Sequence, residues 1–578
     1  MKKNIITVIL FTILNIVSIG AQSVLIENIN IIDVETGKIK KQQHIHIENE
    51  KIISISSKKN IPTDGTTIIN GTDKFIMPGM IDTHIHFFQT GGLYTRPDAI
   101  DLRKVVSYED EIQFAKDIIT DNFKRYLRLG ITSVMDVGGP FYNFKIRDSI
   151  VKNNLSPNVF VTGPLFSPYQ PEAFSKLEDI PIEKISTLEE ASALFNKMLP
   201  YKPDFIKIWY IVNKDNPAKK NFPIVKHIAE LSHKNNLKLA IHATDLNTAK
   251  LAVKAGADIL VHSVRDEIID DEFAKILKKN KVTYIPTLIV SNNYTKTFFS
   301  ELSMHPQDLN YANPKAYASL FDLEGLDSRL IPERFRKIRG SDKQKDAIRL
   351  RFKKFDSVID LNLQKLQKQQ INIATGTDAG NIGTMHASSY IQEIEAMQKS
   401  GITPNDIIKA STINAAKGFG LDHQIGSVTE GKLADLVILN KNPLENIQNL
   451  NTIHEVIKSG KILNISNLIK ESPEQVVQRQ VNAYNARNID AFMDTYADDI
   501  KIYNFPDEIS MEGKEKMRER FKDMFEKVPN LYCNIKNRIV LGNKVIDREY
   551  VRFGEKYSSV IAIYEVTNGK ISKVTFLR

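Results

Sequence analysis

Eight short apolar runs alternate with amphipathic, charged segments between Phe75 and about Gly420, and this alternation constrains the fold more than any other feature of the chain. The runs are the one that ends at His86, followed by ITSVMDV, NVFVTG, DFIKIWY, LKLAIHA, ADILVHS, VTYIPTL and INIATGTD. Strands that alternate with helices form parallel βαβ units, and eight such units close a barrel. We therefore expect an α/β fold with a (β/α)8 TIM barrel over residues 78–420.

The spacing of the runs breaks once, between Leu288 and Ile371, which lie about 80 residues apart. The stretch between them is rich in Phe, Lys and Arg, and its later part has a helical pattern. A structureless loop of this length is uncommon in a compact domain. We expect an insert that folds over the barrel mouth as a lid or binding segment; a purely structural excursion is the alternative.

The segments on both sides of the predicted barrel carry strand patterns. Residues 22–77 contain VLIENINII, HIHIE and KIISI, and residues 421–465 contain GSVTEGKLADLVIL and HEVIKSGKIL. Turn signals separate these runs, so the two segments together predict a small β-sandwich that flanks the barrel. A chain of 578 residues is also long enough for more than one domain.

The C-terminal part of the chain has a different pattern. Residues 466–473 are polar and contain Pro473, which indicates a linker. Within residues 474–578, apolar side chains recur at helical spacing, and four strand-like runs then continue up to Phe576. We expect a separate α+β domain with its own hydrophobic core.

The chain begins with the three-part pattern of a secretory signal peptide. A charged start with Lys2 precedes an apolar run over residues 5–19, and small residues follow at Gly20 and Ala21. The run is shorter than the roughly 20 apolar residues that a membrane-spanning helix needs. We expect residues 1–21 to be removed, which leaves no stable membrane span and a periplasmic or secreted protein. An uncleaved membrane anchor is the alternative.

The net charge of +9 raises the question of a nucleic-acid partner. The lysines and arginines are spread along the chain, often near acidic residues, and no nucleic-acid motif accompanies them. We interpret the charge as a solvated surface and expect no nucleic-acid partner. The single cysteine, Cys533, can form neither an internal disulfide nor a cysteine-rich zinc site.

Several of the predicted strands end in residues that bind metal ions. His84 and His86, at the end of PGMIDTHIH, are two positions apart and so share one face of a strand. Barrel active sites lie at the C-terminal ends of the strands, so both imidazoles would point into the mouth. His242 ends LAIHA, His262 ends ILVHS and Asp378 ends IATGTD in the same way. Imidazole and carboxylate groups suit zinc and similar ions, so these strand ends predict a metal site.

A second His-x-His pair shows that the motif alone is weak. His44 and His46 lie within the predicted sandwich and not at the end of a barrel strand. We expect this pair to face solvent or a sheet edge and to bind no metal.

Lys207, within DFIKIWY, is the remaining unusual residue at a strand end. A buried lysine is costly unless it is paired or neutral. One interpretation is a side chain that extends to solvent. The other is a deprotonated amine that adds carbon dioxide and becomes a carbamate, an oxygen ligand able to bridge two metal ions.

The motifs between Phe75 and Gly460 resemble those of the amidohydrolase superfamily, over roughly two-thirds of the chain. GITPNDIIKASTINAAKGFG and GSVTEGKLADLVIL are similar to the closing helix and sandwich strands of that family, and the lysine strand is similar to its prolidase and imidazolonepropionase-like branch. The resemblance implies two divalent metal ions, for which we expect zinc. By resemblance, the ligands are His84, His86 and Asp378 for one ion, His242 and His262 for the other, and carboxylated Lys207 between them.

The same resemblance implies a hydrolytic mechanism. Water that bridges two metal ions has a strongly lowered pKa and becomes hydroxide near neutral pH. Asp378 would orient it, accept its proton and pass the proton to the leaving nitrogen, as the catalytic acid–base group. Tyr210 and His386, each shortly after a ligand, are candidates for substrate contact, with structural roles as the alternative. Asp136 is expected to support the ligands and Thr287 to line the mouth.

The segment from about Ser472 to Arg578 resembles the ketosteroid-isomerase-like cone fold, also called nuclear transport factor two-like or SnoaL-like. The resemblance rests on VNAYNARNIDAFMDTYADDIKIYNFP, the helix through Phe521 and the final strands. Isomerases of this fold use an aspartate on the strand after the first helices, where this chain has Asn504 and Phe505, with Asp507 in a predicted turn. We therefore expect a binding or dimerising module and a homo-oligomer formed through it.

The leading hypothesis is an exported amidohydrolase whose binuclear centre activates water to cleave a C–N bond. The expected substrates are small cyclic or peptide-like amides, including Xaa-Pro dipeptides and N-acyl amino acids. The same centre would also serve lactone, ester or phosphoester hydrolysis, because a fold and its metals do not identify a substrate. A non-catalytic ligand-binding protein is the alternative of another class. All six expected metal positions are present, which favours an enzyme.

Overall fold

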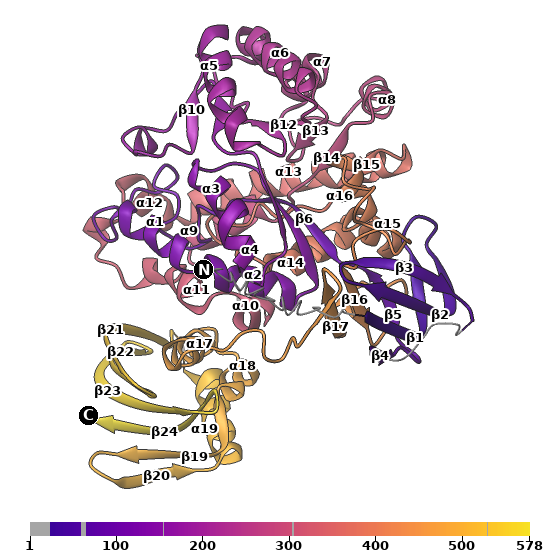
Figure 1. Ribbon diagram of the computed structural model, residues 1–578. Coiled ribbons are helices and arrows are strands. Elements are labelled where there is room, and N and C mark those ends of the chain that lie inside the picture. Colours follow the sequence, from indigo (N-terminus) through magenta and orange to yellow (C-terminus); the bar gives the residue numbers. More distant parts are fainter. Residues whose placement is uncertain (1–22, 59–64, 154, 303–305, 529, 578) are drawn as a thin grey trace, which may run out of the picture.

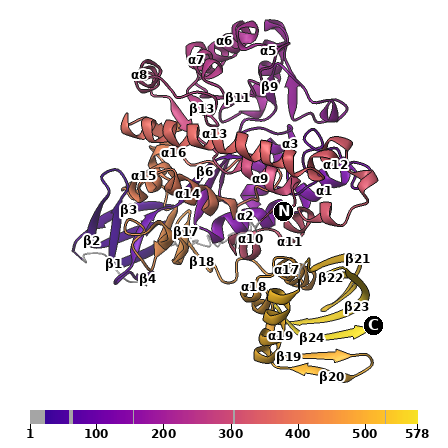
Figure 2. The same ribbon diagram turned by 180° about the vertical axis from the view of Figure 1, so that it is seen from behind.

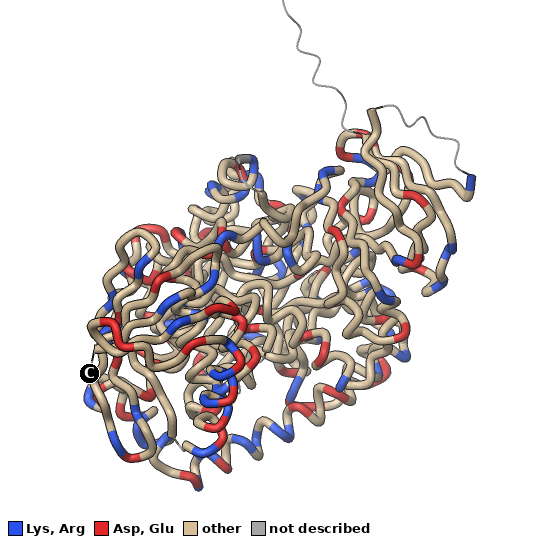
Figure 3. Tube along the Cα trace, turned by 90° about the horizontal axis from the view of Figure 1, so that it is seen from below, with Lys and Arg blue, Asp and Glu red and all other residues tan. Residues whose placement is uncertain are grey.

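The computed structural model describes residues 23–58, 65–153, 155–302, 306–528 and 530–577 (Figure 1). The predicted signal peptide, residues 1–21, lies outside them. Among the described residues, no helix is long and apolar enough to cross a membrane. Lys and Arg are interspersed with Asp and Glu along the described part of the trace (Figure 3).

A three-stranded and a seven-stranded parallel sheet form the centre of the molecule, in the orders β6-β7-β8 and β10-β9-β11-β12-β13-β14-β15. Their strands are β6 (Met80–Ile85), β7 (Ile131–Asp136), β8 (Asn158–Val161), β9 (Leu165–Ser167), β10 (Ile182–Lys184), β11 (Ile206–Ile208), β12 (Leu239–His242), β13 (Ile259–Val261), β14 (Thr283–Ile285) and β15 (Asn372–Ile373). Backbone hydrogen bonds join the two sheets at both gaps, from Thr83 N to Thr375 O at 3.0 Å and from Asp204 N to Val161 O at 3.0 Å. The eight predicted strands therefore lie in one ring, to which β9 and β10 are added.

Helices cover the outside of this ring. They include α2 (Ile119–Arg128), α5 (Leu188–Met198), α6 (Ala218–Lys234), α7 (Leu246–Ala255), α8 (Asp271–Lys279), α14 (Ser389–Lys399), α15 (Pro404–Ala410) and α16 (Ile413–Gly418). Local sequence sets their ends: Asp245 caps α7 by accepting a hydrogen bond from Thr248 N, and Gly256 ends that helix at a φ of 116°. Because helices pack outside and side chains fill the inside, β6, β7, β13 and β14 are buried along their whole length.

The long interval before β15 is helical in its later part, as the sequence pattern there indicates, and also in its earlier part. It contains α9 (Val290–Phe298), α10 (Pro306–Tyr311), α11 (Pro314–Ser319), α12 (Glu333–Arg339) and α13 (Asp342–Lys368). The 27-residue helix α13 crosses the face of the molecule seen in Figure 2. Its buried residues, Asn362, Leu363 and Leu366, lie near its C-terminal end, so most of the helix packs only loosely on the ring.

The two ends of the barrel region meet in one eight-stranded sheet, with β18-β17-β16-β5-β1-β2-β3 in order and β4 paired to β1. Its strands are β1 (Ser23–Asp33), β2 (Lys38–Glu48), β3 (Lys51–Ser56), β4 (Thr66–Asn70), β5 (Phe75–Pro78), β16 (Leu436–Leu439), β17 (Ile453–Lys458) and β18 (Lys461–Leu463). The strands expected for the flanking sandwich are thus joined by hydrogen bonds. They enclose an apolar core of their own, and β1 pairs with β4 along its first half and with β5 further on.

The C-terminal region combines three helices with a six-stranded sheet in the order β20-β19-β24-β23-β22-β21 (Figure 1). The elements are α17 (Pro473–Asn485), α18 (Ile489–Asp494), β19 (Tyr496–Asn504), β20 (Glu508–Glu512), α19 (Lys514–Lys527), β21 (Tyr532–Leu541), β22 (Lys544–Phe553), β23 (Lys556–Thr567) and β24 (Lys570–Leu577). Ser472 begins α17 with a capping box that involves Gln475.

The core of this region is not separate, in contrast to the expectation from sequence. One apolar cluster includes Val476, Val477 and Phe492 together with Leu309, Tyr317 and Leu320 of the helical insert. The physical reason is that α17 turns an apolar face to α11, and the Asn482 side chain donates a hydrogen bond to Pro314 O at 2.9 Å.

The same insert also supports the loop after β6. Leu93 N donates to Ser319 Oγ of α11 at 3.0 Å, and Gly91 N donates to Gly380 O at 2.9 Å, two residues beyond Asp378. A continuous path of contacts therefore runs from the C-terminal region to Asp378.

Candidate metal centre

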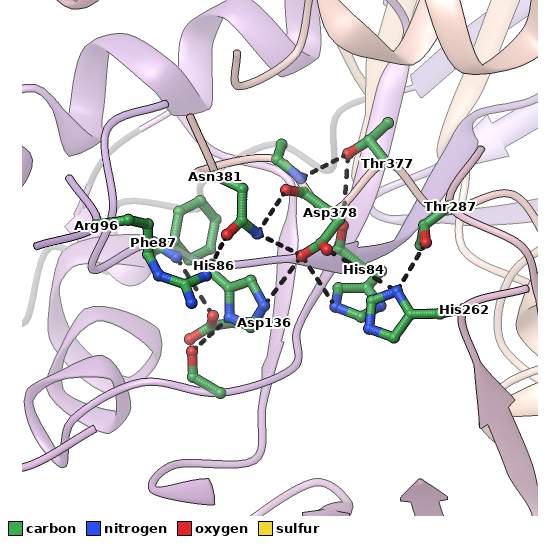
Figure 4. A network of polar contacts seen from close by, with 12 residues as sticks. His84, His86, Phe87, Arg96, Asp136, His262, Thr287, Thr377, Asp378 and Asn381 are labelled. Atoms are coloured by element: carbon green, nitrogen blue, oxygen red, sulfur yellow. Dashed lines mark hydrogen bonds and ion pairs between the residues drawn. The ribbon is translucent and has the colours of Figure 1, made fainter. Parts of the chain in front are cut away.

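Asp378 lies just after β15 and is the point at which the ends of several strands meet (Figure 4). Its Oδ1 atom is 3.2 Å from His84 Nε2 and 3.2 Å from His86 Nε2. Asn381 Nδ2 donates a hydrogen bond to the same oxygen at 2.7 Å. Both imidazoles of the predicted His-x-His pair thus converge on one carboxylate.

The histidines at the ends of β12 and β13 complete the cluster. The ring centroid of His262 is 5.0 Å from that of His84 and 4.4 Å from that of His242. Ligand atoms of His84, His262 and Asp378 all lie within 4.8 Å of one another. Thr287 contacts this cluster directly, because its Oγ1 lies 2.8 Å from His262 Nδ1.

Lys207 is on β11, next to β12, and its side chain lines the same cavity as the histidines and Asp378. It is only 2 % exposed, so it does not extend to solvent. No hydrogen bond or salt bridge connects its side-chain amine with another described residue. Burial lowers the pKa of Lys207 from 10.5 to about 7, so a neutral amine is accessible near neutral pH.

Burial also holds the histidines in the form that binds metal. It lowers the pKa of His84 to about 3 and the pKa values of His242 and His262 well below the ordinary range. Burial would raise the pKa of Asp378, but the neighbouring His84 and His86 lower it. Neutral imidazoles and an ionised carboxylate are the states that metal coordination requires.

The polar atoms of the cluster fit a metal ion. Among the described residues, His84 Nδ1 and His242 Nδ1 are buried without a hydrogen-bond partner, which is unusual for polar atoms in a protein interior. The Nδ1 atom of His86 is 2.8 Å from Gly138 O, which fixes its proton there and leaves a lone pair on Nε2, toward Asp378. A set of imidazoles with one carboxylate is suited to zinc and neighbouring ions.

Backbone strain coincides with the same residues. Asp378, His262 and Thr287 have φ values of 63°, 73° and 46°, in the left-handed region that residues other than glycine rarely adopt. Such conformations persist where the surroundings fix them, and they cluster at functional sites.

Three supporting groups escaped the sequence interpretation. Tyr294 OH donates to Asn381 Oδ1 at 2.7 Å, and Arg96, which is paired with Asp98 at 2.6 Å, also hydrogen-bonds to that oxygen. Asn381 is thereby oriented toward Asp378. Only the placement of Asn381 three residues after Asp378 was a usable signal in the sequence, since Arg96, in a loop, and Tyr294, on α9, are distant in the chain.

Asp136 is fully buried at the end of β7, where it accepts hydrogen bonds from Phe87 N at 3.3 Å and from the Asn143 side chain. Burial raises the pKa of Asp136 to about 7. These hydrogen bonds anchor the chain beside His86, so Asp136 supports a predicted metal ligand through the backbone.

The two candidates for substrate contact differ. Tyr210 lines the cavity, but its hydroxyl donates a hydrogen bond to Ala218 O at 2.5 Å. Its aromatic ring is therefore the part of the side chain that remains for contact with a substrate. His386 is a correction to the expectation. Its Nδ1 is 3.0 Å from Tyr126 OH and its Nε2 is 2.9 Å from Gln89 O, and it is not among the described residues that line the cavity. Both ring nitrogens are engaged inside the protein, which gives His386 a structural position.

The second His-x-His pair lies on β2, in the flanking sheet. His46 Nε2 is 3.0 Å from Ser23 Oγ and 3.5 Å from Glu48 Oε1. No group of potential metal ligands found among the described residues includes His44 or His46.

The cavity over the cluster has a volume of about 450 Å³. Its apolar walls come from Phe88, Leu165, Trp209, Val212, Leu288, Phe352 and Phe355. The last two belong to α13, so the helical insert forms part of the mouth.

A second cavity, of about 410 Å³, lies inside the C-terminal region. Its walls are mainly apolar and aromatic, and its buried carboxyl group, Glu549, accepts a hydrogen bond from Tyr564 OH at 2.6 Å. The described residues that line this cavity do not include Asn504, Phe505 or Asp507. The position at which isomerases of this fold carry their aspartate therefore supplies no carboxylate to the cavity. Glu549 was not anticipated from the sequence.

Comparison with known proteins gives two family matches. Residues 75–463 match the Amidohydrolase family, and residues 477–574 match the SnoaL-like domain. Among characterised relatives, the ochratoxinase of Aspergillus niger is 22% identical over 72% of this chain and 81% of its own length. A 5-methylthioadenosine/S-adenosylhomocysteine deaminase of Teredinibacter turnerae is 27% identical, but over only 22% of this chain and 30% of that protein.

Solved structures share the fold at low identity. A Xaa-Pro dipeptidase with bound methionine in the active site superposes with a TM-score of 0.56 and 21% identity, over 76% of this chain and 100% of that chain. The A. niger ochratoxinase gives a TM-score of 0.55 and 19% identity, over 76% and 95%.

Proposed function

The chain belongs to the amidohydrolase family, and from this premise we propose that it is a metal-dependent hydrolase that cleaves a C–N bond in a small cyclic or peptide-like amide. The observation that carries the proposal is the meeting of His84, His86 and His262 around Asp378 at the ends of different strands. We also propose export through the N-terminal signal, which leaves a mature N-terminus close to Gln22.

We assign two divalent ions to this centre, with zinc as the first choice. His84, His86 and Asp378 would hold one ion, and His242 and His262 the other, with Lys207 between them. When bound, the ions lower the pKa of water and polarise the substrate carbonyl.

Lys207 would supply an oxygen ligand for the ions by reacting with carbon dioxide. Its buried amine loses a proton at a pKa of about 7, attacks the carbon atom and forms an N–C bond. One further proton leaves the nitrogen, and the product is a carbamate with two oxygen atoms. This converts a side chain that would repel cations into one that attracts them.

Asp378 carries out the proton transfers. Asn381 and the two imidazoles orient its carboxylate, and the low pKa of the group keeps it ionised. It accepts a proton from the attacking water and donates that proton to the leaving nitrogen. The apolar walls of the cavity exclude competing water and strengthen these interactions.

The names of the relatives favour a C–N bond, since a Xaa-Pro dipeptidase and deaminases are among them. Ester, lactone or phosphoester hydrolysis would use the same residues. The test is to purify the mature protein, measure its metal content and screen it, zinc-loaded, with dipeptides, N-acyl amino acids and lactones.

We expect about two metal ions per chain by analogy with the family arrangement, and cleavage of at least one amide class. Cleavage of lactones alone would support the second function. Full metal content without any hydrolysis would leave a ligand-binding protein, and the absence of bound metal would refute the site.

A further inference from the structure

The charge of the cavity wall restricts which amides can bind. On the premise of the proposed function, we propose that the substrate carries a carboxylate group and that Arg265 binds it. The substrate class is then an N-acyl amino acid or dipeptide with an apolar side chain, and neutral amides are poor substrates.

Arg265 lies on the rim of the ring beside the metal centre. It is three residues beyond His262, and its backbone N donates a hydrogen bond to Thr244 O at 3.1 Å, two residues beyond His242. This bond fixes the start of its side chain between the ends of β12 and β13. The side chain lines the same cavity as Lys207 and Asp378.

The guanidinium group of Arg265 is half-buried and, among the described residues, has no hydrogen-bond or salt-bridge partner. Arginine has five donors and stays charged, so burial without an acceptor is costly. Burial and the neighbouring Arg351 lower the pKa of Arg265, while Asp245 and Asp266 partly oppose this without contacting it. A half-buried guanidinium group without an acceptor is suited to bind an anion from outside the protein.

The other charged groups of the cavity are already engaged. The cationic residues among the described lining are Arg96, Lys207 and Arg265. Arg96 is paired with Asp98, and Lys207 belongs to the proposed ligand set. Of the carboxylates, Asp356 accepts a hydrogen bond from Asn292 at 3.4 Å and Asp378 belongs to the metal centre. Arg265 is therefore the cation of this lining that remains for a substrate.

The neighbours of Arg265 indicate what else the substrate carries. Its Cζ atom lies 5.2 Å from the ring centroid of Phe355, and Phe352, Leu288 and Val212 line the same cavity. A carboxylate bound to Arg265 would therefore lie beside an apolar wall. An amino acid with a large apolar side chain meets both requirements.

A competing explanation is that Arg265 only holds α13 in place through Phe355. The chain offers a matched control for it. Arg351 places its Cζ atom at the same distance, 5.2 Å, from the same ring, but it is not among the described residues that line the metal cavity. Arg351→Met and Arg265→Met thus each remove one charge and one equivalent ring contact.

The test compares N-acetyl-L-phenylalanine with N-acetylphenethylamine, which has the same scissile amide and ring but no carboxylate. The wild type should prefer the acid in kcat/KM by about tenfold to a hundredfold, the value of a hydrogen-bonded charge. Arg265→Met should reduce this ratio to near one, mainly through KM, and Arg351→Met should leave it within about threefold. A merely structural role would lower both rates and leave the ratio unchanged, and that result would overturn the proposal.

Binding provides a readout that does not depend on turnover. Calorimetry with L-phenylalanine should show binding to zinc-loaded wild type and Arg351→Met, and binding at least about tenfold weaker to Arg265→Met. Hydrolysis of both probes at equal rates by the wild type would sink the carboxylate inference and leave the proposed function intact. If neither probe is cleaved, the binding of L-phenylalanine decides. Equal affinity of the three proteins for L-phenylalanine, or no binding by any of them, would overturn the proposed role of Arg265.

Discussion

Two cavities of this protein are nearly equal in volume, about 450 Å³ over the metal cluster and about 410 Å³ in the C-terminal region, yet they differ in how their polar groups are placed. In the first, the histidines of the metal cluster lie at or just beyond the ends of strands, where apolar runs stop. In the second, Glu549 stands in the middle of β22. A polar residue that ends an apolar run is conspicuous in a sequence, whereas one inside an alternating strand resembles the exposed positions around it.

The burial of β22 makes this contrast concrete. Val545, Asp547, Glu549 and Val551 all face inward. Asp547 is paired with Arg538 at 2.6 Å, and Glu549 is bonded to Tyr564. Because side chains alternate between the two faces of a strand, the sequence places both carboxylates on the same face as the two valines. This alternation was the signal from which their burial could have been predicted.

The largest effect should come from the strand-end residues. Changing both His84 and His86 to Ala should remove bound metal and lower kcat/KM by at least about a thousandfold, because the ions supply several kcal/mol of transition-state stabilisation. Changing His44 and His46 to Ala is the matched control and should leave metal content and activity nearly intact. Equal losses in the two double variants would break the distinction between strand-end and mid-strand histidines.

Lys207→Ala should follow, with a loss on the order of a hundredfold, because one proposed metal ligand is lost while the five others remain. The substitution leaves a space beside the ions in which acetate or formate can supply oxygen ligands. Added short carboxylates should therefore restore part of the activity of Lys207→Ala but none of that of His242→Ala. Recovery in both variants, or in neither, would contradict a bridging carbamate. Bicarbonate should also speed metal loading of the wild type.

Removal of the C-terminal region should have a smaller but measurable effect on the activity of the metal centre. A protein that ends at Asn467 exposes the apolar face of α11, which also holds Leu93 through Ser319. We expect a lower Tm and about tenfold less activity, because small misplacements near a reacting centre are costly. Unchanged Tm and activity in the shortened, monomeric protein would show that the shared core does not support the metal centre. Loss of self-association alone would identify the region as a dimerising module.

The smallest expected effect concerns Glu549 and stability. Burial raises the pKa of Glu549 from 4.5 to about 7, so the folded state holds this proton more tightly than the unfolded state. The contribution of Glu549 to the free energy of unfolding is therefore highest below pH about 4.5 and falls as pH rises to about 7. Glu549→Gln does not titrate, so its free energy of unfolding does not fall in this way. The difference in free energy of unfolding between this variant and the wild type should grow across that window by at most about 3 kcal/mol. Denaturation at several pH values measures it, with the exposed Glu555→Gln as the control; a constant difference would contradict a buried, titrating carboxyl.

These differences define what the sequence could predict. The ring strands, the cluster at their ends and the helical insert all follow from apolar periodicity and the residues that interrupt it. Arg96, Asn381 and Arg265 do not, because their roles depend on which loops meet above the ring. His386 has both ring nitrogens engaged inside the protein, which matches the structural alternative for this residue, since nearness to Asp378 in the chain does not determine where a side chain points. The shared core of α11 and α17 depends on contacts between segments more than 150 residues apart, which local patterns do not encode.

The eight-stranded sheet beside the barrel has a consequence for how the chain is made. Leu436 of β16 pairs with Pro78 of β5, and about 360 residues lie between them. A ribosome that adds about 5–20 residues per second takes on the order of half a minute to synthesise that interval. Throughout it, β1 to β5 exist without the strand that completes their sheet. The N-terminal strands of this protein are therefore the segment that a holding chaperone has the longest time to protect, and a pause in translation before β16 would extend that exposure.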